Sequence, residues 1–251
     1  MVIMVLEISD FLSRVEASQY TIFTQKFHFS VSKTLKKFNG HIEQKDNNNY
    51  LVSYRSVTDA VQCALEVQYK FKYVTPKHKS FSRRLKIALS ACNNLNEKAI
   101  VLATRMCEIV KDQVVISEEV KQLYDTANEK AKIDAELIHA LSPDEEQLLS
   151  NVMDHVEANW ARPDFNVRSF SKALGYNYSQ LYKRLIHLTG KTPNNFIKEF
   201  RLHKALVLLH DHSDSISEIA DNTGFSSPTY FSKCFLKKYG IRPSKYRQQH
   251  T

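Results

Sequence analysis

One structural pattern occurs twice within residues 167–225, and this repeat constrains the fold more than any other feature of the sequence. Residues 167–176 read VRSFSKALGY, and residues 216–225 read ISEIADNTGF. Each copy carries apolar residues at helical spacing, then a small residue, then a glycine followed by an aromatic residue. That spacing buries one face of a short helix, and the glycine lets the chain leave with a positive φ. The pattern predicts two helix-turn-helix motifs.

The segment after each glycine predicts a second helix. Asn177 is suited to cap the first of these helices, while Ser227 with Pro228 is a favoured helix start in the second copy. The inward-facing residues are apolar in both helices: Leu181, Leu185 and Leu188 in one, Phe231 and Phe235 in the other. Both copies then end with a glycine and, three residues later, a proline, at residues 190–193 and 240–243. Because the copies match in register, the repeat is a far more specific signal than either copy alone.

Residues 194–210 separate the two copies and contain neither glycine nor proline, which predicts one long helix. A helix of this length spans roughly 25 Å at 1.5 Å per residue. Helix-turn-helix proteins place their second helices in major-groove segments about 34 Å apart. We therefore expect the long helix and its turns to hold the two second helices at about that spacing, as a two-fold dimer does for single motifs.

The positive charge is concentrated in the part of the chain that contains the repeat. The chain of 251 residues has a formal net charge of +8. Residues 160–251 contain 15 Lys and Arg against 6 Asp and Glu, a net charge of +9, whereas residues 1–159 carry a net charge of −1. A basic face is what binding to a phosphate backbone requires. A solvated surface is the simpler interpretation of such a bias by itself, so its coincidence with the repeat is what favours nucleic acid.

Composition and cysteine usage narrow the class of protein further. No apolar run approaches the ~18–20 residues of a membrane span. The four cysteines are scattered without a C-x-x-C pair, so we expect no disulfide framework, no metal site and a reducing compartment. The apolar residues 1–6 lack a basic start and predict a strand, not a secretory signal. We expect a cytoplasmic protein that does not enter a membrane.

Residues 1–124 have the alternating pattern of an α+β domain. Strands are expected at residues 2–8, 41–44, 50–54, 84–91 and 114–117, and helices at residues 57–68 and 100–110. Residues 46–49 are a turn-forming cluster between two of the strands. Residues 18–35 mix aromatic and β-branched residues with polar ones, and the sequence does not assign their type.

The order of these elements resembles the catalytic fold of class III nucleotide cyclases, a ferredoxin-like sheet with helices, over residues 1–124. The likeness rests on order and spacing, and it is carried by residues 5–8, 40–54, 57–70, 85–90, 101–109 and 115–119. An unrelated ferredoxin-like α+β domain is the alternative. Since class III cyclase domains work as dimers, the resemblance implies a homodimer through this domain.

The same resemblance places the cyclase machinery on named positions. The two metal-binding carboxylates would fall on Glu7 and Asn48, and the base-recognising lysine on Gln44. The asparagine and arginine that assist the transition state would fall on Val101 and Arg105. Asn48 carries no charge and is a poor ligand for a divalent metal, whereas two-metal chemistry needs both carboxylates. We expect a degenerate domain with no catalytic residue, no metal and no cofactor.

Residues 125–141 are charged and contain several alanines, and we expect them to form a linker helix between two domains. A new helix then starts at Ser142, with Pro143 at its first position and Glu145 placed to reach back to the cap. The second domain, residues 142–251, is expected to be all-α, with two helix-turn-helix motifs joined by the long helix.

Residues 148–249 closely resemble the DNA-binding domain of the AraC/XylS family of bacterial transcription regulators. The resemblance rests on SKALGY at residues 171–176, on RLxxAxxLL from Arg201 and on IxxIAxxxGF from Ile216, and it continues through residues 230–247. It implies a double helix-turn-helix domain that binds double-stranded DNA. Ser171 departs from the small apolar residue that is usual in the family, but its hydroxyl is able to bond to the preceding turn.

Outward positions of the two second helices are candidate DNA contacts. Base contacts are expected from Tyr178, Ser179, Tyr182 and Lys183 in the first helix and from Thr229, Ser232 and Lys233 in the second. Phosphate contacts are expected from Arg184, Lys237, Lys238, Arg242 and Arg247. Lysine donates to guanine, hydroxyls serve several bases, and a tyrosine ring fits against a thymine methyl. Alternatively, Tyr182 packs on the helix pair, and Lys237 and Lys238 are only solvated.

Together these patterns predict a sequence-specific transcription regulator, not an enzyme, whose front domain dimerises or senses an unknown small-molecule effector. The alternative is a nucleotide cyclase, or a nucleotide-binding switch, that carries a DNA-binding tail. Asn48 and Val101 are the residues that discriminate between the two. A partner protein that docks on the front domain is a third option, and it leaves no mark in the sequence.

Overall fold

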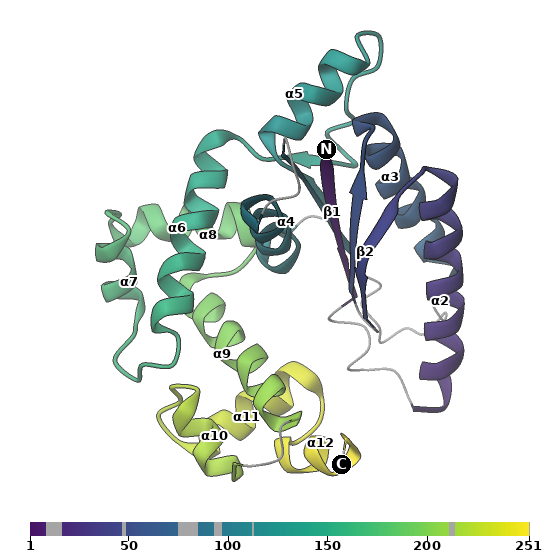
Figure 1. The fold of residues 1–251 in the computed structure, drawn as a ribbon. Helices are drawn as coiled ribbons and strands as arrows, with labels where there is room; N and C mark the ends of the chain where they lie inside the picture. Colours follow the sequence, from purple (N-terminus) through teal and green to yellow (C-terminus); the bar gives the residue numbers. More distant parts are fainter. Residues whose placement is uncertain are drawn as a thin grey trace. The chain divides into compact units, whose positions relative to one another are not determined.

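The structure is a computed structural model that describes residues 1–8, 17–46, 49–74, 85–92, 97–111, 113–210 and 214–250. The chain divides into two compact units, Met1–Ser150 and Asn151–Thr251 (Figure 1). The boundary expected at residue 142 precedes this division. Among the described residues, no helix combines the length and the apolar character needed to cross a lipid bilayer.

Within the described residues, the first unit is built on a six-stranded sheet. Its strands are β1 Val2–Glu7, β2 His41–Lys45, β3 Asn49–Tyr54, β4 Lys86–Ala91, β5 Val114–Ile116 and β6 His139–Ala140. Their order in space is β2-β3-β1-β4-β5-β6. Neighbours from β2 to β4 are antiparallel, whereas β5 is parallel to both β4 and β6. The five expected strands are thus confirmed where the structure describes them.

Helices cover both faces of this sheet (Figure 1). They are α2 Ala17–Lys37, α3 Val57–Val74, α4 Glu97–Ile109 and α5 Glu118–Ala127. α2 and α3 pack on each other over one face, where Met4 and Leu6 of β1 join the main core. On the other face α4 packs on β1 and β4, and the Ser90 hydroxyl donates to the Ala99 carbonyl at 2.7 Å. Since side chains alternate between faces, β1 is buried on both sides, which explains its unbroken apolar run.

The segment that the sequence left unassigned, residues 18–35, lies within the helix α2. Phe27, Val31 and Leu35 are buried at intervals of four residues, and the Thr34 hydroxyl donates to the Ser30 carbonyl one turn back. β-branched and aromatic residues have only slightly reduced helix propensity. Packing of this apolar stripe against α3 and the sheet therefore decides the type of the element.

The expected linker helix over residues 125–141 is wrong. α5 ends at Ala127, where the Asn128 amide group donates to the Tyr124 carbonyl at 2.9 Å and to the Thr58 hydroxyl at 2.8 Å. The chain then returns to the sheet, and β6 pairs with β5. Ile138 and Leu141 on either side of β6 are buried. These residues belong to the first unit because the edge of β5 offers them backbone partners.

The second unit is helical. Its helices are α6 Pro143–Asn159, which includes the division between the units, α7 Val167–Ala173, α8 Tyr178–Thr189, α9 Pro193–His210, α10 Ile216–Asn222, α11 Pro228–Tyr239 and α12 Pro243–His250. The expected start of α6 is confirmed, because the Ser142 hydroxyl accepts from the Glu145 amide at 3.3 Å and the Glu145 carboxylate accepts from the Ser142 amide at 2.9 Å. The long helix expected over residues 194–210 is confirmed as α9.

α9 packs against helices from both copies of the repeated pattern. It contacts α8, α10 and α12. One core cluster joins its side chains with those of the last three helices: Leu202, Ala205, Leu209, Ile219, Ala220, Phe225, Phe231, Phe235 and Tyr246. A single rigid element therefore supports both copies of the repeated pattern.

Candidate nucleic-acid interface

The helix pairs α7–α8 and α10–α11 turn in the same way. Gly175 and Gly224 have φ angles of 73° and 72°. The Tyr176 amide donates to the Ser171 carbonyl at 2.9 Å, and the Phe225 amide donates to the Ala220 carbonyl at 3.0 Å. This bond across six residues, with glycine in the left-handed conformation, is the Schellman ending of a helix. The repeat in the sequence is therefore a repeat in the backbone.

Capping side chains set the start of each second helix. The Asn177 side chain accepts from the Gln180 amide at 2.9 Å, and the Gln180 side chain accepts from the Asn177 amide at 3.0 Å. In the second pair the Ser227 hydroxyl accepts from the Tyr230 amide at 3.2 Å, and Pro228 occupies the first turn. The cap follows the glycine by two residues in the first pair and by three in the second, so the second turn is one residue longer, as the sequence indicates.

The inner faces of the two second helices are those the sequence predicts. Leu181, Leu185 and Leu188 are fully buried in α8, as are Phe231 and Phe235 in α11. Both helices end in a left-handed glycine, Gly190 and Gly240. Because the inner faces are fixed by burial, the opposite faces of α8 and α11 are the ones presented outward.

Ser171 and Ala220 are the small residues at the crossing of each helix pair, and both are buried. The Ser171 hydroxyl donates to the Arg168 carbonyl at 3.1 Å. The hydroxyl at this position thus has a hydrogen-bond partner in the preceding turn, as expected. It is not left as a buried unpaired polar group at the helix crossing.

Glu199 of α9 binds lysines that belong to both halves of the unit. Its carboxylate lies 3.0 Å from the Lys191 ammonium, before α9, and 3.0 Å from the Lys238 ammonium, in the last turn of α11. Burial raises the pKa of the Glu199 carboxyl, but the two lysines together outweigh it and hold the pKa below its usual value. Glu199 is therefore an anionic tie between the two helix pairs.

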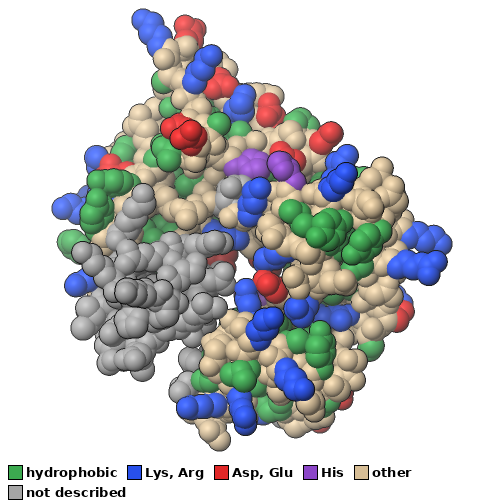
Figure 2. Space-filling view, turned by 180° about the vertical axis from the view of Figure 1, so that it is seen from behind, with side chains coloured by type: hydrophobic (Ala, Val, Ile, Leu, Met, Phe, Trp, Pro, Cys, Tyr) green, Lys and Arg blue, Asp and Glu red, His purple; other side chains and the backbone are tan. Residues whose placement is uncertain are grey.

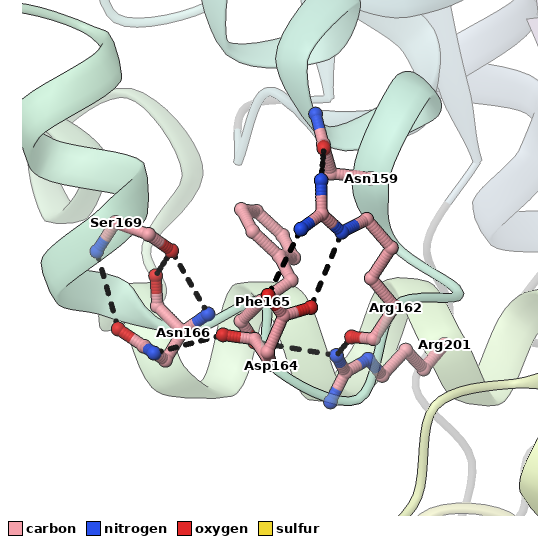
Figure 3. A network of polar contacts seen from close by, with 7 residues as sticks. All are labelled: Asn159, Arg162, Asp164, Phe165, Asn166, Ser169 and Arg201. Carbon is pink, nitrogen blue, oxygen red and sulfur yellow. Dashed lines mark hydrogen bonds and ion pairs between the residues drawn. The ribbon is translucent and has the colours of Figure 1, made fainter.

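Arg201, two residues further along α9, holds the connection between α6 and α7 (Figure 3). Its guanidinium donates to the carbonyls of Trp160 at 2.7 Å, Arg162 at 2.8 Å and Phe165 at 3.3 Å. Burial lowers the pKa of Arg201, but an arginine stays protonated. The fork of the guanidinium thus satisfies backbone carbonyls of the connection between α6 and α7, which has no helical hydrogen-bond ladder of its own.

The same connection touches the turn of the second helix pair. A Cβ atom on Gly224 would lie 2.9 Å from the Ala161 carbonyl oxygen and 3.0 Å from that of Trp160. At Gly175 an added Cβ would meet nothing within 4 Å. The segment between α6 and α7 therefore locks α9 and the α10–α11 turn together.

The candidate base contacts lie on the outward faces. In α8 the side chains of Tyr178, Ser179, Tyr182 and Lys183 are exposed; in α11 Thr229 and Lys233 are exposed, and Ser232 is half-buried. The rings of Tyr178 and Tyr182 are 6.1 Å apart. Tyr182 keeps 37% of its surface exposed, so its ring is partly covered by the helix pair and partly open to solvent.

The candidate phosphate contacts divide into two groups. Arg184, Lys237 and Arg242 are exposed, and the Arg184 guanidinium lies 5.0 Å above the ring of Tyr176. Lys238 is instead bound to Glu199, and an Arg247 amino group donates to the Asp214 carbonyl at 2.6 Å. Lys238 and Arg247 thus hold the unit together. Lys and Arg side chains gather over the lower part of the face shown in Figure 2.

Sequence reasoning missed the roles of Glu199 and Arg201. One signal was available for Glu199: it is the only acidic residue between Asp164 and Asp211. Coulomb attraction draws lysines to a lone carboxylate in a strongly basic segment, so this composition predicts an ion pair at Glu199. Arg201 stands in a motif that was recognised, but its carbonyl partners lie about 40 residues earlier and leave no local pattern.

The structure describes four of the five positions of the cyclase machinery. Glu7 lies directly opposite Lys86 in the antiparallel pair β1–β4, and the Lys86 ammonium donates to the carbonyls of Glu108 at 3.1 Å and Val110 at 3.0 Å. Val101 and Gln44 are exposed and Arg105 is half-buried, while Asn48 lies outside the described residues. Within the described part of the chain, no group of three or more His, Cys, Asp or Glu side chains is placed to hold a metal ion.

Known proteins resemble the C-terminal part of this chain. A family profile described as "Helix-turn-helix domain" matches residues 170–249. The chain is 41% identical over 111 residues to "Histidine kinase P4" of Formosa agariphila, covering 44% of this chain and 8% of that protein. It is 32% identical over 102 residues to "HTH-type transcriptional regulator MtrA" of Neisseria gonorrhoeae, covering 41% and 32%. It is 32% identical over 113 residues to "HTH-type transcriptional activator RhaR" of Pectobacterium atrosepticum, covering 43% and 39%.

Solved structures give further similarities. A transcriptional regulator of Chromobacterium violaceum with an AraC-type DNA-binding domain is 26% identical, with a TM-score of 0.40, over 44% of this chain and 97% of that chain. The catalytic core of a rhodopsin-guanylyl cyclase is 17% identical, with a TM-score of 0.40, over 49% and 79%. The chain spans less than two-fifths of the length of each of the three protein relatives. From the matched profile and the relatives, the C-terminal region of this chain is a helix-turn-helix domain of the AraC type.

Proposed function

We propose that the chain is a transcription regulator that binds double-stranded DNA sequence-specifically, with α8 and α11 as the recognition helices of two helix-turn-helix motifs. The observation that carries the proposal is the repeated turn: both pairs bury the same face of their second helix and present the opposite face to solvent. Helix-turn-helix proteins insert that exposed face into the major groove. The names of the similar regulators agree with this assignment.

In this function α9 sets the distance between the two recognition helices. Its 18 residues correspond to roughly 27 Å of helix at 1.5 Å per residue. Together with the flanking turns this supports recognition helices about 34 Å apart, the spacing of successive major-groove segments on one side of the duplex. The tie through Glu199 and the clamp through Arg201 keep the two helix pairs from moving independently.

DNA contacts are assigned by exposure. Tyr178, Ser179, Tyr182, Lys183, Thr229, Ser232 and Lys233 are proposed to face base edges, and Arg184, Lys237 and Arg242 to face phosphates. Lys238 and Arg247 are bound within the domain, so we propose that they affect DNA binding only indirectly, by fixing the backbone segments around them. Phosphate contacts position the protein, whereas base-edge contacts carry the sequence preference.

For the first domain we propose a degenerate cyclase-like, ferredoxin-like fold that dimerises or senses a ligand. The strand order β2-β3-β1-β4 with antiparallel neighbours, and two helices on one face, supports a ferredoxin-like arrangement of residues 1–124. We propose that residues 125–141, through β6, complete that domain and that the DNA-binding domain begins with the capped helix at residue 142, within which the two compact units divide. As a regulator of bacterial transcription, the chain would act in the cytoplasm.

The alternative of a nucleotide cyclase is opposed by Lys86. The register of β1 and β4 places this basic residue beside the remaining carboxylate, and a nearby positive charge disfavours the binding of a divalent cation there. Incubation of the protein with Mn²⁺ and ATP or GTP is therefore expected to give no cyclic nucleotide. Robust production of a cyclic nucleotide would overturn the assignment as a non-enzyme, while binding without turnover, measured by calorimetry, would favour a nucleotide-sensing regulator.

Selection of bound fragments from random duplex DNA tests the central proposal. We expect two half-elements about one helical turn, or ~10 base pairs, apart on one face of the duplex. The observed affinity should fall steeply with salt, as counterion release requires. A protein that ignores duplex DNA at modest ionic strength is not the regulator proposed.

A further inference from the structure

The two recognition helices differ in the chemistry of their outward faces. Counted from the caps Asn177 and Ser227, both helices carry an exposed lysine at the same position, Lys183 and Lys233. The correspondence fails at the first and the fifth positions after the cap. The first residue after the cap is Tyr178 in α8 and Pro228 in α11, and the fifth is Tyr182 in α8 and Ser232 in α11.

The aromatic residues of α8 belong to an exposed apolar stripe. Tyr178, Tyr182 and Ile186 follow one another at intervals of four residues, and 53%, 37% and 36% of their surfaces are exposed. Residues at this interval lie above one another on a helix, and the rings of the two tyrosines are 6.1 Å apart. The stripe is not part of the hydrophobic core, because the leucines of α8 form its buried face. An exposed apolar stripe in a basic domain indicates a contact surface.

α11 has an exposed tyrosine as well, but in a different place. Tyr230 corresponds by position to Gln180, not to either tyrosine of α8. Its ring packs 6.1 Å from that of Phe225, and a hydrogen bond with the Cys234 thiol raises the pKa of its hydroxyl. Tyr230 keeps 49% of its surface exposed, but it packs on its own helix pair at a position that neither tyrosine of α8 occupies. At the positions of those two tyrosines α11 carries Pro228 and Ser232, whereas Leu236, 41% exposed, corresponds to Ile186.

We propose that α8 recognises thymine through the C5-methyl group, whereas α11 recognises its half-element through hydrogen bonds. The thymine methyl is the apolar group that base pairs display in the major groove. Two tyrosine rings at one-turn spacing, which α11 lacks at the matching positions, form a surface that gains by removing such methyls from water. The occupant is duplex DNA and not an apolar protein partner, because this stripe lies in the region with a net charge of +9.

This inference rests on the proposed function and makes it asymmetric. The half-element under α8 contains thymines whose methyl groups contribute to affinity. The half-element under α11 contains bases chosen by donors and acceptors, and its thymines, where present, contribute through O4 and not through the methyl. A duplex of two identical half-elements is therefore not the preferred site.

The test replaces thymine by deoxyuridine, which lacks only the methyl group. A duplex chosen by selection from random DNA is synthesised with this replacement in one half-element at a time, and affinity is measured by fluorescence anisotropy. Lys183→Ala and Lys233→Ala identify which half-element lies under which helix. We expect affinity to fall about fourfold per contacted methyl in the α8 half-element, the ratio that corresponds to one buried methyl group. The α11 half-element should show no loss.

Variants at Tyr182 connect the methyl effect to the stripe. Tyr182→Ala should bring the affinity ratio between thymine and deoxyuridine duplexes close to one, whereas Tyr182→Phe keeps the ring and should keep the ratio. Ser232→Ala, at the corresponding position of α11, should leave the ratio unchanged. Tyr182 is exposed, so these variants are expected to fold, and circular dichroism with thermal unfolding checks this.

The outcomes separate the inference from the proposed function. Selected sites without thymine under α8, equal deoxyuridine effects in both half-elements, or a methyl effect that survives Tyr182→Ala would each overturn thymine-methyl recognition and leave the regulator intact. Absence of any binding to duplex DNA would overturn the proposed function itself.

Discussion

The two helix pairs of the second unit are alike in backbone and unlike in surroundings. Each turns through a glycine in the left-handed conformation, and each caps its recognition helix with a polar side chain. Gly175 faces open space, whereas Gly224 is pressed against the carbonyls of Trp160 and Ala161. One local pattern thus serves two purposes: a free turn in the first pair, and a turn that also joins the domain together in the second.

The supporting contacts follow the same division. The clamp by Arg201 holds the connection between α6 and α7, which in turn touches the turn before α11. Glu199 reaches Lys238 at the end of α11 as well as Lys191 after α8. The second pair is thus fixed by contacts from distant segments, and substitutions there should have the larger effects on stability.

The largest effect is expected at the second turn. Gly224→Ala should destabilise the protein by about 2–5 kcal/mol, because a left-handed alanine costs ~1–2 kcal/mol and crowding against backbone adds ~1–3 kcal/mol. Gly175→Ala, which meets no neighbour, should cost only the ~1–2 kcal/mol of backbone strain. Denaturant unfolding of both variants measures the difference, and equal losses would abolish the distinction between the two turns.

Removal of the clamp should be nearly as severe. Arg201→Ala should cost about 2–4 kcal/mol, because several carbonyls lose a charged donor that contributes ~1.5–3 kcal/mol per bond. Arg201→Lys keeps the charge but loses the planar fork, so it should recover part of the stability. Denaturant unfolding provides the values. A loss below about 0.5 kcal/mol for the alanine variant, the range of ordinary surface substitutions, would remove Arg201 from this role.

The lysines at matching positions of the two recognition helices allow a test in DNA binding. Lys183→Ala should relax base preference in one half-element and Lys233→Ala in the other, each by about 1–3 kcal/mol of discrimination. Lys237→Ala, on the exposed side of α11, should instead weaken all sequences alike and reduce the salt slope by about one. Competition binding with mutated half-elements over a salt series separates these results. Loss of preference in the same half-element for both lysines contradicts the tandem arrangement.

The smallest effect is expected from the tie at Glu199. The folded protein holds the pKa of this carboxyl below its usual value, so its contribution to stability is present above the ordinary pKa of glutamate, about 4.5, and is lost as the pH falls through the lowered pKa. Glu199→Gln should reduce stability at neutral pH by less than about 1 kcal/mol, as for a partly exposed ion pair. It should also flatten the loss of stability below that pH. Unfolding curves of both proteins between neutral and acidic pH provide the measurement, and parallel pH profiles would argue against the tie.

Elements whose signals lie within a few residues were predictable. The glycine turns, the caps at Asn177 and Ser227 and the capped start at Ser142 each depend on contacts across three to six residues. α2 was not assigned, because its residue types favour no element strongly and burial against α3 decides. β6 has two residues and no pattern of its own, since it exists only where the edge of β5 accepts it.

The candidate site shows the same limit. Exposed positions such as Tyr178, Tyr182 and Lys233 followed from helical periodicity, because the buried face of a short helix fixes its opposite face. The ion pair between Lys238 and Glu199 could not be predicted from periodicity, since the two residues are 39 positions apart in the sequence. Likewise, Glu7 was a candidate ligand by its type, and the strand register alone placed Lys86 opposite it.

The sequence by itself determined that two helix pairs form, where each turns and which faces of α8 and α11 point inward, because these depend on residue spacing and caps along one short segment. Only the tertiary structure decided which basic side chains are left for a ligand and which are bound inside the domain. The physical reason is that an ion pair or a buried carbonyl selects its partner by proximity in space, and chain segments far apart in sequence supply that proximity only after α9 has brought both halves together.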